Sequence, residues 1–249
     1  MSKPYLLVDC GNSRSKWALL DSTGLGAVSY VDNSAAPDQI IEKLPSAESL
    51  DKVYLAAVSS SQIPNQISSH FNRLPISLLR VKNPYLGLGL AYKSIDQLGV
   101  DRWLAMLWAW LNYQQSCLVV NIGTAMTIDA INDAGEHLGG VITPGPRLQF
   151  QSLHQHTHAI DLQTVKTFSK QNRWGKNTTD CVQAGVLYAL SDSLQQHFHA
   201  LASQNKQTPK LIISGGDAAA ILPHIEIDYV QQPDIVLHGM AAIAERDHA

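Results

Sequence analysis

The sequence predicts an α/β protein built from two duplicated halves, residues 1–115 and 116–249. Strand-like apolar runs alternate with helical patterns along the chain. The opening run LLVDCGNSRSKWALL, an apolar strand, a small polar turn and a second strand, returns near the middle as CLVVNIGTAMTIDAI. A length of 249 residues suits one large domain or two ordinary ones, at about 150 residues per domain.

The repeat is supported by a constant shift of 112 residues. This shift aligns Asp9 with Asn121 and Gly11 with Gly123. It also aligns three further pairs: Asn12 with Thr124, Ser15 with Thr127 and Asp21 with Asp133. A chance match is the alternative, because glycine and small polar residues are common in turns. Matching flanking strands favour duplication, which would place the two polar turns across a cleft, where small ligands bind.

The other elements follow from apolar patterning in chain order. In the first half we expect strands over 53–58 and 75–81, a helix over 64–71 between them, and a buried helix over 101–113. In the second half we expect a long helix over 179–199. A strand beginning KLIIS, and a short strand followed by a terminal helix within PDIVLHGMAAIAERD, complete the chain.

The composition favours a small-molecule partner. Hydrophobic residues make up 45% and charged residues 16%, and the formal net charge of −3 offers no basic field for nucleic acid or anionic membrane. The apolar stretch Trp103–Leu111 is far shorter than the roughly 20 residues that cross a bilayer. The N-terminus lacks the pattern of a secretory signal. We therefore expect a cytoplasmic protein with neither nucleic acid nor membrane as a partner.

The first polar turn, Asp9–Lys16, has the parts of a phosphate-binding site. Gly11 permits a tight backbone, Lys16 brings positive charge, and Asp9 is suited to hold Mg²⁺ directly or through water. Hydroxyl and amide donors lie between them. The Walker pattern GxxxxGK[ST] does not occur here. An ordinary hairpin turn with a surface lysine is the alternative.

The segment GVDRW, residues 99–103, sets an acid beside an arginine at the start of the buried helix. Adjacent helical side chains point about 100° apart, so Asp101 and Arg102 are poorly placed to pair with each other. Asp101 is then a candidate general base for a hydroxyl, and Arg102 a candidate anion ligand. A helix cap or dipole partner is the alternative for Asp101.

Three further segments carry weaker signals. SGGDA, residues 214–218, follows a strand and precedes a helix, as nucleotide-binding turns do in α/β folds. GGVITPG, residues 139–145, belongs to a third strand that we expect after the Asp-Ala-Gly turn, and a simple turn between a strand and a helix is the alternative to a functional role. HQHTH, residues 154–158, has no acidic or cysteine partner, so we expect solvated loop histidines.

Taken together, the chain resembles the type III pantothenate kinases, members of the acetate kinase, sugar kinase, Hsp70 and actin superfamily. The motifs that carry this resemblance stand in the family's order: DCGNSRSK, GLAY, GVDRW, NIGTAMTID, GGVITPG, GKNTTDCVQAG and ISGGDA. The resemblance implies duplicated ribonuclease H-like, or actin-like ATPase, domains. Each would have a mixed sheet flanked by helices, with a cleft between the two.

The resemblance also implies an activity. The family uses ATP and Mg²⁺ to phosphorylate pantothenate to 4′-phosphopantothenate, the first step of coenzyme A biosynthesis, and works as a homodimer. Two alternatives stay open at this point. The first is a non-catalytic regulatory or accessory protein of the same fold. The second is a kinase for another small hydroxyl-bearing substrate.

Matching the family's motifs assigns roles to residues of this chain. Asp101 would be the general base, and Asp9 would hold the metal. ATP would be bound by Asp9, Cys10, Gly11, Asn12, Ser13, Arg14, Ser15, Lys16 and Thr124. Pantothenate would be bound by Tyr92, Gly99, Val100, Asp101, Arg102 and Thr178, the last reaching across the dimer.

Asn121 departs from the family pattern. The family has aspartate at this point of its DxGTA turn and uses it to bind a monovalent cation, K⁺ or NH4⁺. An amide oxygen still coordinates a cation but lacks formal charge, so we expect a weaker site. The family's proline ahead of the GxDR turn is also missing, and Ser94 and Ile95 occupy that region.

Overall fold

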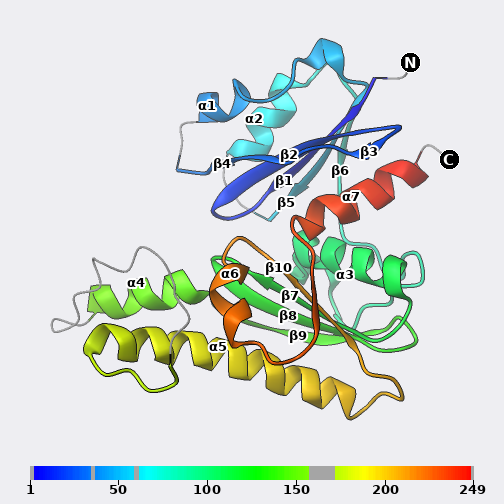
Figure 1. Ribbon diagram of the computed structural model, residues 1–249. Helices are drawn as coiled ribbons and strands as arrows, with labels where there is room; N and C mark the ends of the chain where they lie inside the picture. The colour runs from blue at the N-terminus through cyan, green and yellow to red at the C-terminus, as the bar shows by residue number, and fades with distance from the viewer. Residues whose placement is uncertain (1–2, 35–36, 59–61, 157–171, 248–249) are drawn as a thin grey trace. The chain divides into compact units, whose positions relative to one another are not determined.

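The computed structural model describes residues 3–34, 37–58, 62–156 and 172–247. The chain forms two compact units (Figure 1). Unit 1 comprises Met1–Leu88, Tyr92–Leu111 and Asp234–Ala249, and unit 2 comprises Gly89–Ala91 and Asn112–Pro233. Within the described residues, every helix is too short or too polar to span a lipid bilayer.

Unit 1 is built on a mixed sheet with the strand order β3-β2-β1-β5-β6, and β4 pairs with β2. Its strands are β1 (Tyr5–Cys10), β2 (Arg14–Asp21), β3 (Gly24–Leu25), β4 (Ser29–Asp32), β5 (Lys52–Ala57) and β6 (Ile76–Leu78). Its helices are α1 (Pro37–Ile41), α2 (Ile63–His70), α3 (Val100–Tyr113) and α7 (Ile235–Arg246). Strand β1 is antiparallel to β2 and parallel to β5.

Side-chain alternation along β1 decides which face of this sheet carries chemistry. Leu6, Val8 and Cys10 are fully buried and join one apolar cluster with residues of α1 and α2. Leu7 and Asp9 therefore point to the opposite face, because successive residues of a strand alternate. Helix α7 packs against β1, β2 and β5 and lies across the sheet from α1 and α2 (Figure 1).

Helices α3 and α7 of unit 1 approach each other closely. A Cβ atom at Gly239 of α7 would clash with the backbone carbonyl of Leu104 in α3, so glycine is required for this contact. Trp103 and Leu104 are fully buried, and Arg102 is also buried at 7% exposure. The expected helix over 101–113 is thus confirmed as α3, which begins one residue earlier, at Val100.

Unit 2 is built on a five-stranded sheet with the order β11-β10-β7-β8-β9. Its strands are β7 (Cys117–Ile122), β8 (Ala125–Ile131), β9 (His137–Pro144), β10 (Lys210–Ser214) and β11 (Tyr229–Gln231). Its helices are α4 (Pro146–His156), α5 (Thr178–Ala202) and α6 (Ala218–Ile221). Apolar residues of all three helices form one cluster with β7, β8 and β10, and α5 runs along the sheet (Figure 1).

The two sheets share one topology, which confirms the duplication. In unit 1, β2 is antiparallel to β1, and β5 and β6 continue in parallel on the other side. In unit 2, β8 is antiparallel to β7, and β10 and β11 continue in parallel. The opening hairpins therefore occupy equivalent places in the two units.

The constant shift of 112 residues is wrong beyond the turns. The first turn joins Cys10 to its cross-strand partner Ser15, whereas the second joins Ile122 to Met126, one residue sooner. Lys16, which lies opposite Asp9, is therefore equivalent to Thr127, which lies opposite Asn121. The second hairpin therefore has the hydroxyl of Thr127 where the first has the ammonium group of Lys16.

The compact units do not coincide with sequence halves cut at 115 and 116, because α7 packs on the sheet of unit 1. The segment GGVITPG is mostly strand, since β9 continues to Pro144. His154 lies in helix α4 rather than in a loop, which corrects that expectation. Residues 157–158 of the histidine motif lie outside the described residues.

Candidate active site

The turn between β1 and β2 is closed by its own backbone. The Gly11 N–H donates a 3.0 Å hydrogen bond to the Arg14 carbonyl. A Cβ at Gly11 would lie 3.0 Å from that same oxygen, so a larger residue would press against the turn. Ser15 is fully buried, while Asn12 and Ser13 are exposed. The exposed part of the turn is thus polar and small, as a phosphate site requires.

Asn33 braces this turn from the loop after β4. Its Nδ2 donates to the carbonyl oxygens of Gly11 at 2.8 Å and Asn12 at 3.2 Å, and its Oδ1 accepts from Ser15 Oγ at 2.8 Å. Its backbone N–H donates to the Ser13 carbonyl at 2.8 Å. Sequence reasoning missed Asn33, because nothing in its neighbourhood connects a single asparagine with a turn 18 residues earlier.

Asp9 and Lys16 face each other across the β1–β2 ladder, and cross-strand partners share one face of a sheet. Lys16 Nζ donates a 2.6 Å hydrogen bond to Asp234 Oδ1, at the start of α7. Burial removes water from around the Asp9 carboxylate and raises the pKa of Asp9 to about 7. The negative charges of Asp101 and Asp234 also raise the pKa of Asp9, and Lys16 lowers it.

Those couplings place three carboxylates and one ammonium group within electrostatic reach in unit 1. The sequence predicted Asp9, Lys16 and Asp101 as site residues separately, and the structure brings them together. Asp234 was missed, since it lies more than 200 positions from Lys16. The short strand expected at this point is also wrong, because helix α7 begins directly after Asp234.

Two residues of the turn have restricted roles. Burial raises the pKa of the Cys10 thiol to about 12, so this thiol is not a nucleophile and only its backbone is suited to contact ATP. Arg14 Nε donates to Asp32 Oδ1 at 2.9 Å, and the guanidinium lies 5.0 Å from the centre of the Tyr30 ring. Arg14 is therefore held along the exposed side of the hairpin.

Asp101 lies in the first turn of α3 and its carboxylate is folded back over the helix start. Its Oδ1 accepts a 2.8 Å hydrogen bond from the Arg102 backbone N–H. A Cβ at Gly99 would lie only 2.5 Å from the same oxygen, so glycine leaves the room that this orientation needs. The capping alternative therefore describes part of what Asp101 does. The helix dipole and this backbone hydrogen bond orient the Asp101 carboxylate. The negative charge of the same carboxylate raises the pKa of Asp9.

Arg102 and Tyr92 form a second contact in unit 1. Arg102 Nη1 donates a 2.9 Å hydrogen bond to the Tyr92 hydroxyl, and the guanidinium lies 5.8 Å from the ring centre. Arg102 is buried, and Tyr92 is half-buried. The guanidinium of Arg102 thus contacts Tyr92, which lies in the loop before α3. Val100, the remaining residue of this motif with an assigned role, is buried.

In unit 2, three glycine-containing turns meet at the carboxyl end of β7. The Gly145 N–H donates to the Thr124 carbonyl at 2.8 Å, and a Cβ at Gly145 would clash with the Gly123 carbonyl. Gly215 has a φ of +104° and packs against the backbone of Ile122. The segments GGVITPG and SGGDA therefore lie next to Thr124 at the carboxyl end of β7. Ligands of α/β sheets bind outside the carboxyl ends of strands.

An ion pair borders the same turns of unit 2. Arg147 Nε donates to Asp217 Oδ1 at 2.7 Å, which joins the start of α4 to the SGGDA turn. Thr124 is exposed, and Asn121 lies in β7 opposite Thr127. Thr178 is exposed at the first position of α5, next to the capping residue Asn177, whose side chain accepts from the Asp180 N–H.

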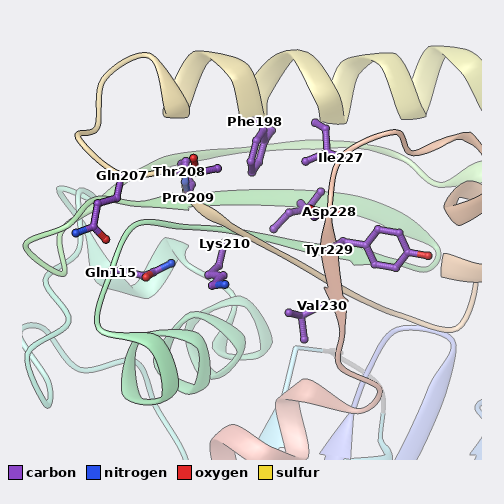
Figure 2. A pocket seen from close by; sticks show the side chains of 11 residues that line it. Gln115, Phe198, Gln207, Thr208, Pro209, Lys210, Ile227, Asp228, Tyr229 and Val230 are labelled. Atoms are coloured by element: carbon purple, nitrogen blue, oxygen red, sulfur yellow. The ribbon is translucent and has the colours of Figure 1, made fainter.

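A cavity of about 560 Å³ lies elsewhere in unit 2 (Figure 2). Lys210 and Tyr229, the first residues of β10 and β11, line it together with Gln115 and Asp228. These are the amino ends of parallel strands, opposite to the end of β10 that pairs with Asn121. The cavity contains none of the residues that the sequence predicted as functional.

A magnesium ion fits the donor set around Asp9. Among the residues that the structure describes, no group of three or more histidine, cysteine, aspartate or glutamate side chains forms a metal cage. Mg²⁺ in phosphoryl-transfer sites takes one or two carboxylates and completes its shell with phosphate oxygens and water. One carboxylate beside a candidate phosphate-binding turn therefore meets the requirement for such an ion.

Comparisons with known proteins agree with this geometry. The model of a family described as type III pantothenate kinase matches residues 5–200. A type III pantothenate kinase from Nitrosococcus oceani is 32% identical over 253 residues, covering 96% of this chain and 93% of the relative.

Solved structures support the fold. A Campylobacter jejuni protein assigned to the Baf family of transcriptional activators superposes with a TM-score of 0.61 at 21% identity, covering 97% of this chain and 98% of that one. MreB5 of Spiroplasma citri bound to ADP superposes with a TM-score of 0.54 at 12% identity, covering 98% and 97%. At such identities the likeness concerns the fold alone, and it confirms the expected actin-like architecture.

Proposed function

This chain belongs to the type III pantothenate kinase family, and we propose that its own site residues transfer the γ-phosphoryl group of ATP to the primary hydroxyl of pantothenate. The products are ADP and 4′-phosphopantothenate, the first intermediate of coenzyme A biosynthesis. The observation that carries the proposal is the grouping of Asp9, Lys16 and Asp101 in unit 1. A purely structural role would require none of these charges.

The β1–β2 turn is the proposed phosphate site of unit 1. Its small exposed residues present backbone and side-chain donors, and Lys16 supplies a positive charge beside them. Asp9 would hold Mg²⁺, which would neutralise charge on the phosphate oxygens when bound. Thr124, in the equivalent turn of unit 2, is the proposed second contact to ATP.

Asp101 is the proposed general base. The hydrogen bond from the Arg102 N–H and the room left by Gly99 hold its carboxylate in one orientation. As the acceptor oxygen bonds to the γ-phosphorus, the bond from that phosphorus to ADP breaks and the hydroxyl proton passes to Asp101. Phosphoryl transfer needs little more than positioning and charge stabilisation, so one oriented carboxylate is sufficient.

Arg102 and Tyr92 are the proposed pantothenate contacts of unit 1. A buried guanidinium is an effective ligand for a carboxylate, because its planar donors match the two oxygens. Its hydrogen bond to Tyr92 fixes the plane in which those donors point. We assign the carboxylate of pantothenate to Arg102 on this basis.

Three further features belong to the same proposal. Thr178 would complete the pantothenate site of a partner subunit in a homodimer, and its exposure at the start of α5 suits such a role. Asn121 would leave the monovalent cation site weak, because an amide carries no charge. A cytoplasmic location accords with a small-molecule kinase of acidic net charge.

An ADP-release assay with and without pantothenate tests the proposal, with Asp101→Asn as the decisive variant. We expect pantothenate-dependent turnover in the natural protein and a loss of at least 100-fold in kcat for Asp101→Asn. Asp96→Asn, an exposed aspartate nearby, is the matched control and should retain activity. ADP release that ignores pantothenate would favour another acceptor, and an absence of turnover with intact ATP binding would favour an accessory protein.

A further inference from the structure

Asp234 occupies a helix-capping position without acting as a cap. It immediately precedes α7 and adopts left-handed backbone angles of φ 53° and ψ 33°. Aspartate in this position ordinarily accepts a hydrogen bond from a backbone N–H of the first helical turn. Among the described residues its carboxylate makes no such bond. It accepts the 2.6 Å hydrogen bond from Lys16 Nζ instead.

The surroundings of Lys16 explain why a fixed partner matters. Its four-carbon side chain is flexible, and Asp9 lies directly across the strand pair. Asp9 is the proposed metal ligand, so an ammonium group that folded onto it would compete with the metal. Asp234 approaches Lys16 from α7 rather than from the hairpin. Side chains of both residues are about one-quarter exposed, at 25% and 24%, so the pair borders solvent and is accessible to a phosphate.

We infer that Asp234 is a positioning residue, which holds the Lys16 ammonium group away from Asp9 and ready for a phosphate oxygen of ATP. The inference rests on the proposed function, in which the β1–β2 turn binds the phosphates. Asp234 acts through Lys16 and need not touch the nucleotide. A preformed ammonium position lowers the cost of ordering a flexible side chain when the phosphate binds.

The place of Asp234 in the chain adds a consequence. Pro233 is the last residue of unit 2, and Asp234 is the first residue of the segment that returns to unit 1. The ion pair therefore joins the start of α7 to the β1–β2 hairpin within unit 1. The position of the Lys16 ammonium group in the N-terminal hairpin thus depends on Asp234, which lies close to the other end of the sequence.

Asp234→Asn is the variant that isolates the carboxylate. Asparagine has the same shape and tolerates left-handed angles, so the backbone at the start of α7 should persist. We expect the Kd for the magnesium complex of AMPPNP, measured by calorimetry, to rise about tenfold. The KM for ATP should rise similarly, while the KM for pantothenate stays within twofold. Asp51→Asn, which changes an exposed aspartate of the same unit that has no assigned role, is the control and should leave both values unchanged.

A double-mutant cycle separates this role from a structural one. Lys16→Met should weaken AMPPNP binding more than tenfold, and adding Asp234→Asn should weaken it no further, because the ammonium group that Asp234 positions is already absent. Additive losses would overturn the inference. Asp234→Gly, which removes the left-handed strain, should keep the melting temperature while losing the same affinity.

The outcomes also distinguish the inference from the function on which it rests. Tight AMPPNP binding by Asp234→Asn together with weak binding by Lys16→Met would refute the inference and leave the phosphate site standing. Normal binding by Lys16→Met would refute both, because Lys16 would then make no contact with phosphate.

Discussion

Arg102 Nη1 donates a 2.9 Å hydrogen bond to the hydroxyl of Tyr92, ten residues earlier in the chain. The sequence carried these two residues in separate motifs, GLAY and GVDRW. The contact joins the loop before α3 to the first turn of that helix. A buried guanidinium with one donor assigned to a phenol has a defined plane, and that plane decides how an anion can approach.

Tyr92→Phe should weaken pantothenate recognition while preserving the fold. Loss of one hydrogen bond to a charged group is worth about 1.5–3 kcal/mol, and we expect the KM for pantothenate to rise about tenfold with little change in the KM for ATP. Steady-state kinetics with each substrate varied in turn measures both. Tyr30→Phe, whose exposed ring lies beside Arg14, is the control. Equal rises in the two KM values would contradict a role in the pantothenate site.

Gly99→Ala should reduce catalysis more than binding. The added methyl group would meet Asp101 Oδ1 at 2.5 Å and force the carboxylate to rotate. We expect kcat to fall about 10- to 100-fold, because a general base loses efficiency when it leaves hydrogen-bond reach of the hydroxyl. The KM for ATP should change little. Gly185→Ala, at an open position of helix α5, is the matched control, and a normal kcat in Gly99→Ala would contradict the steric argument.

Asp9→Asn should change the pH dependence of stability. Because the pKa of Asp9 is raised to about 7 in the folded protein, the folded state binds a proton that the unfolded state releases near pH 4. The stability linked to Asp9 is therefore fully present below pH 4 and is lost as pH rises through about 7. Asparagine resembles the protonated acid and avoids this loss.

Urea unfolding of the metal-free and nucleotide-free protein measures this effect. Relative to the natural protein, Asp9→Asn should gain roughly 2–3 kcal/mol in free energy of unfolding between pH 5 and pH 8. Ser29→Ala, at the exposed start of β4, changes no titrating group and should leave the pH dependence as in the natural protein. A stability difference that is the same at both pH values would exclude a raised pKa at Asp9.

Asn121→Asp should strengthen the response to monovalent cations. A formal negative charge replaces an amide dipole in β7, so the K⁺ concentration for half-maximal activity should fall by about tenfold or more. Rates measured against KCl at constant ionic strength give this value. Asn172→Asp, an exposed substitution in the same unit, controls for added charge. Unchanged K⁺ affinity in Asn121→Asp would show that charge at this position does not limit the site.

The fold followed from periodicity and repetition. Most strands and helices were predictable because apolar alternation and helical spacing are local properties, and α3 and α5 begin one residue from the expected positions. The short elements β4, α1 and β11 were not among the expected ones. The duplication was predictable because both opening hairpins place small polar residues between apolar strands. The residue-by-residue equivalence of the two hairpins was not predictable. The second turn is one residue shorter, so Lys16 is equivalent to Thr127, and only the strand register shows this.

The sequence by itself determined the α/β duplication and the family of this chain, because each motif is a short stretch that is recognised from its residue types, and the motifs follow one another in the family's order. Only the tertiary structure decided what surrounds them. Asn33 braces the first turn and Asp234 holds Lys16, yet both look like ordinary loop and capping residues in the sequence. Such contacts depend on which face of β1 each side chain takes and on where α7 returns to the sheet. Those are consequences of packing between distant segments, which local patterns do not encode.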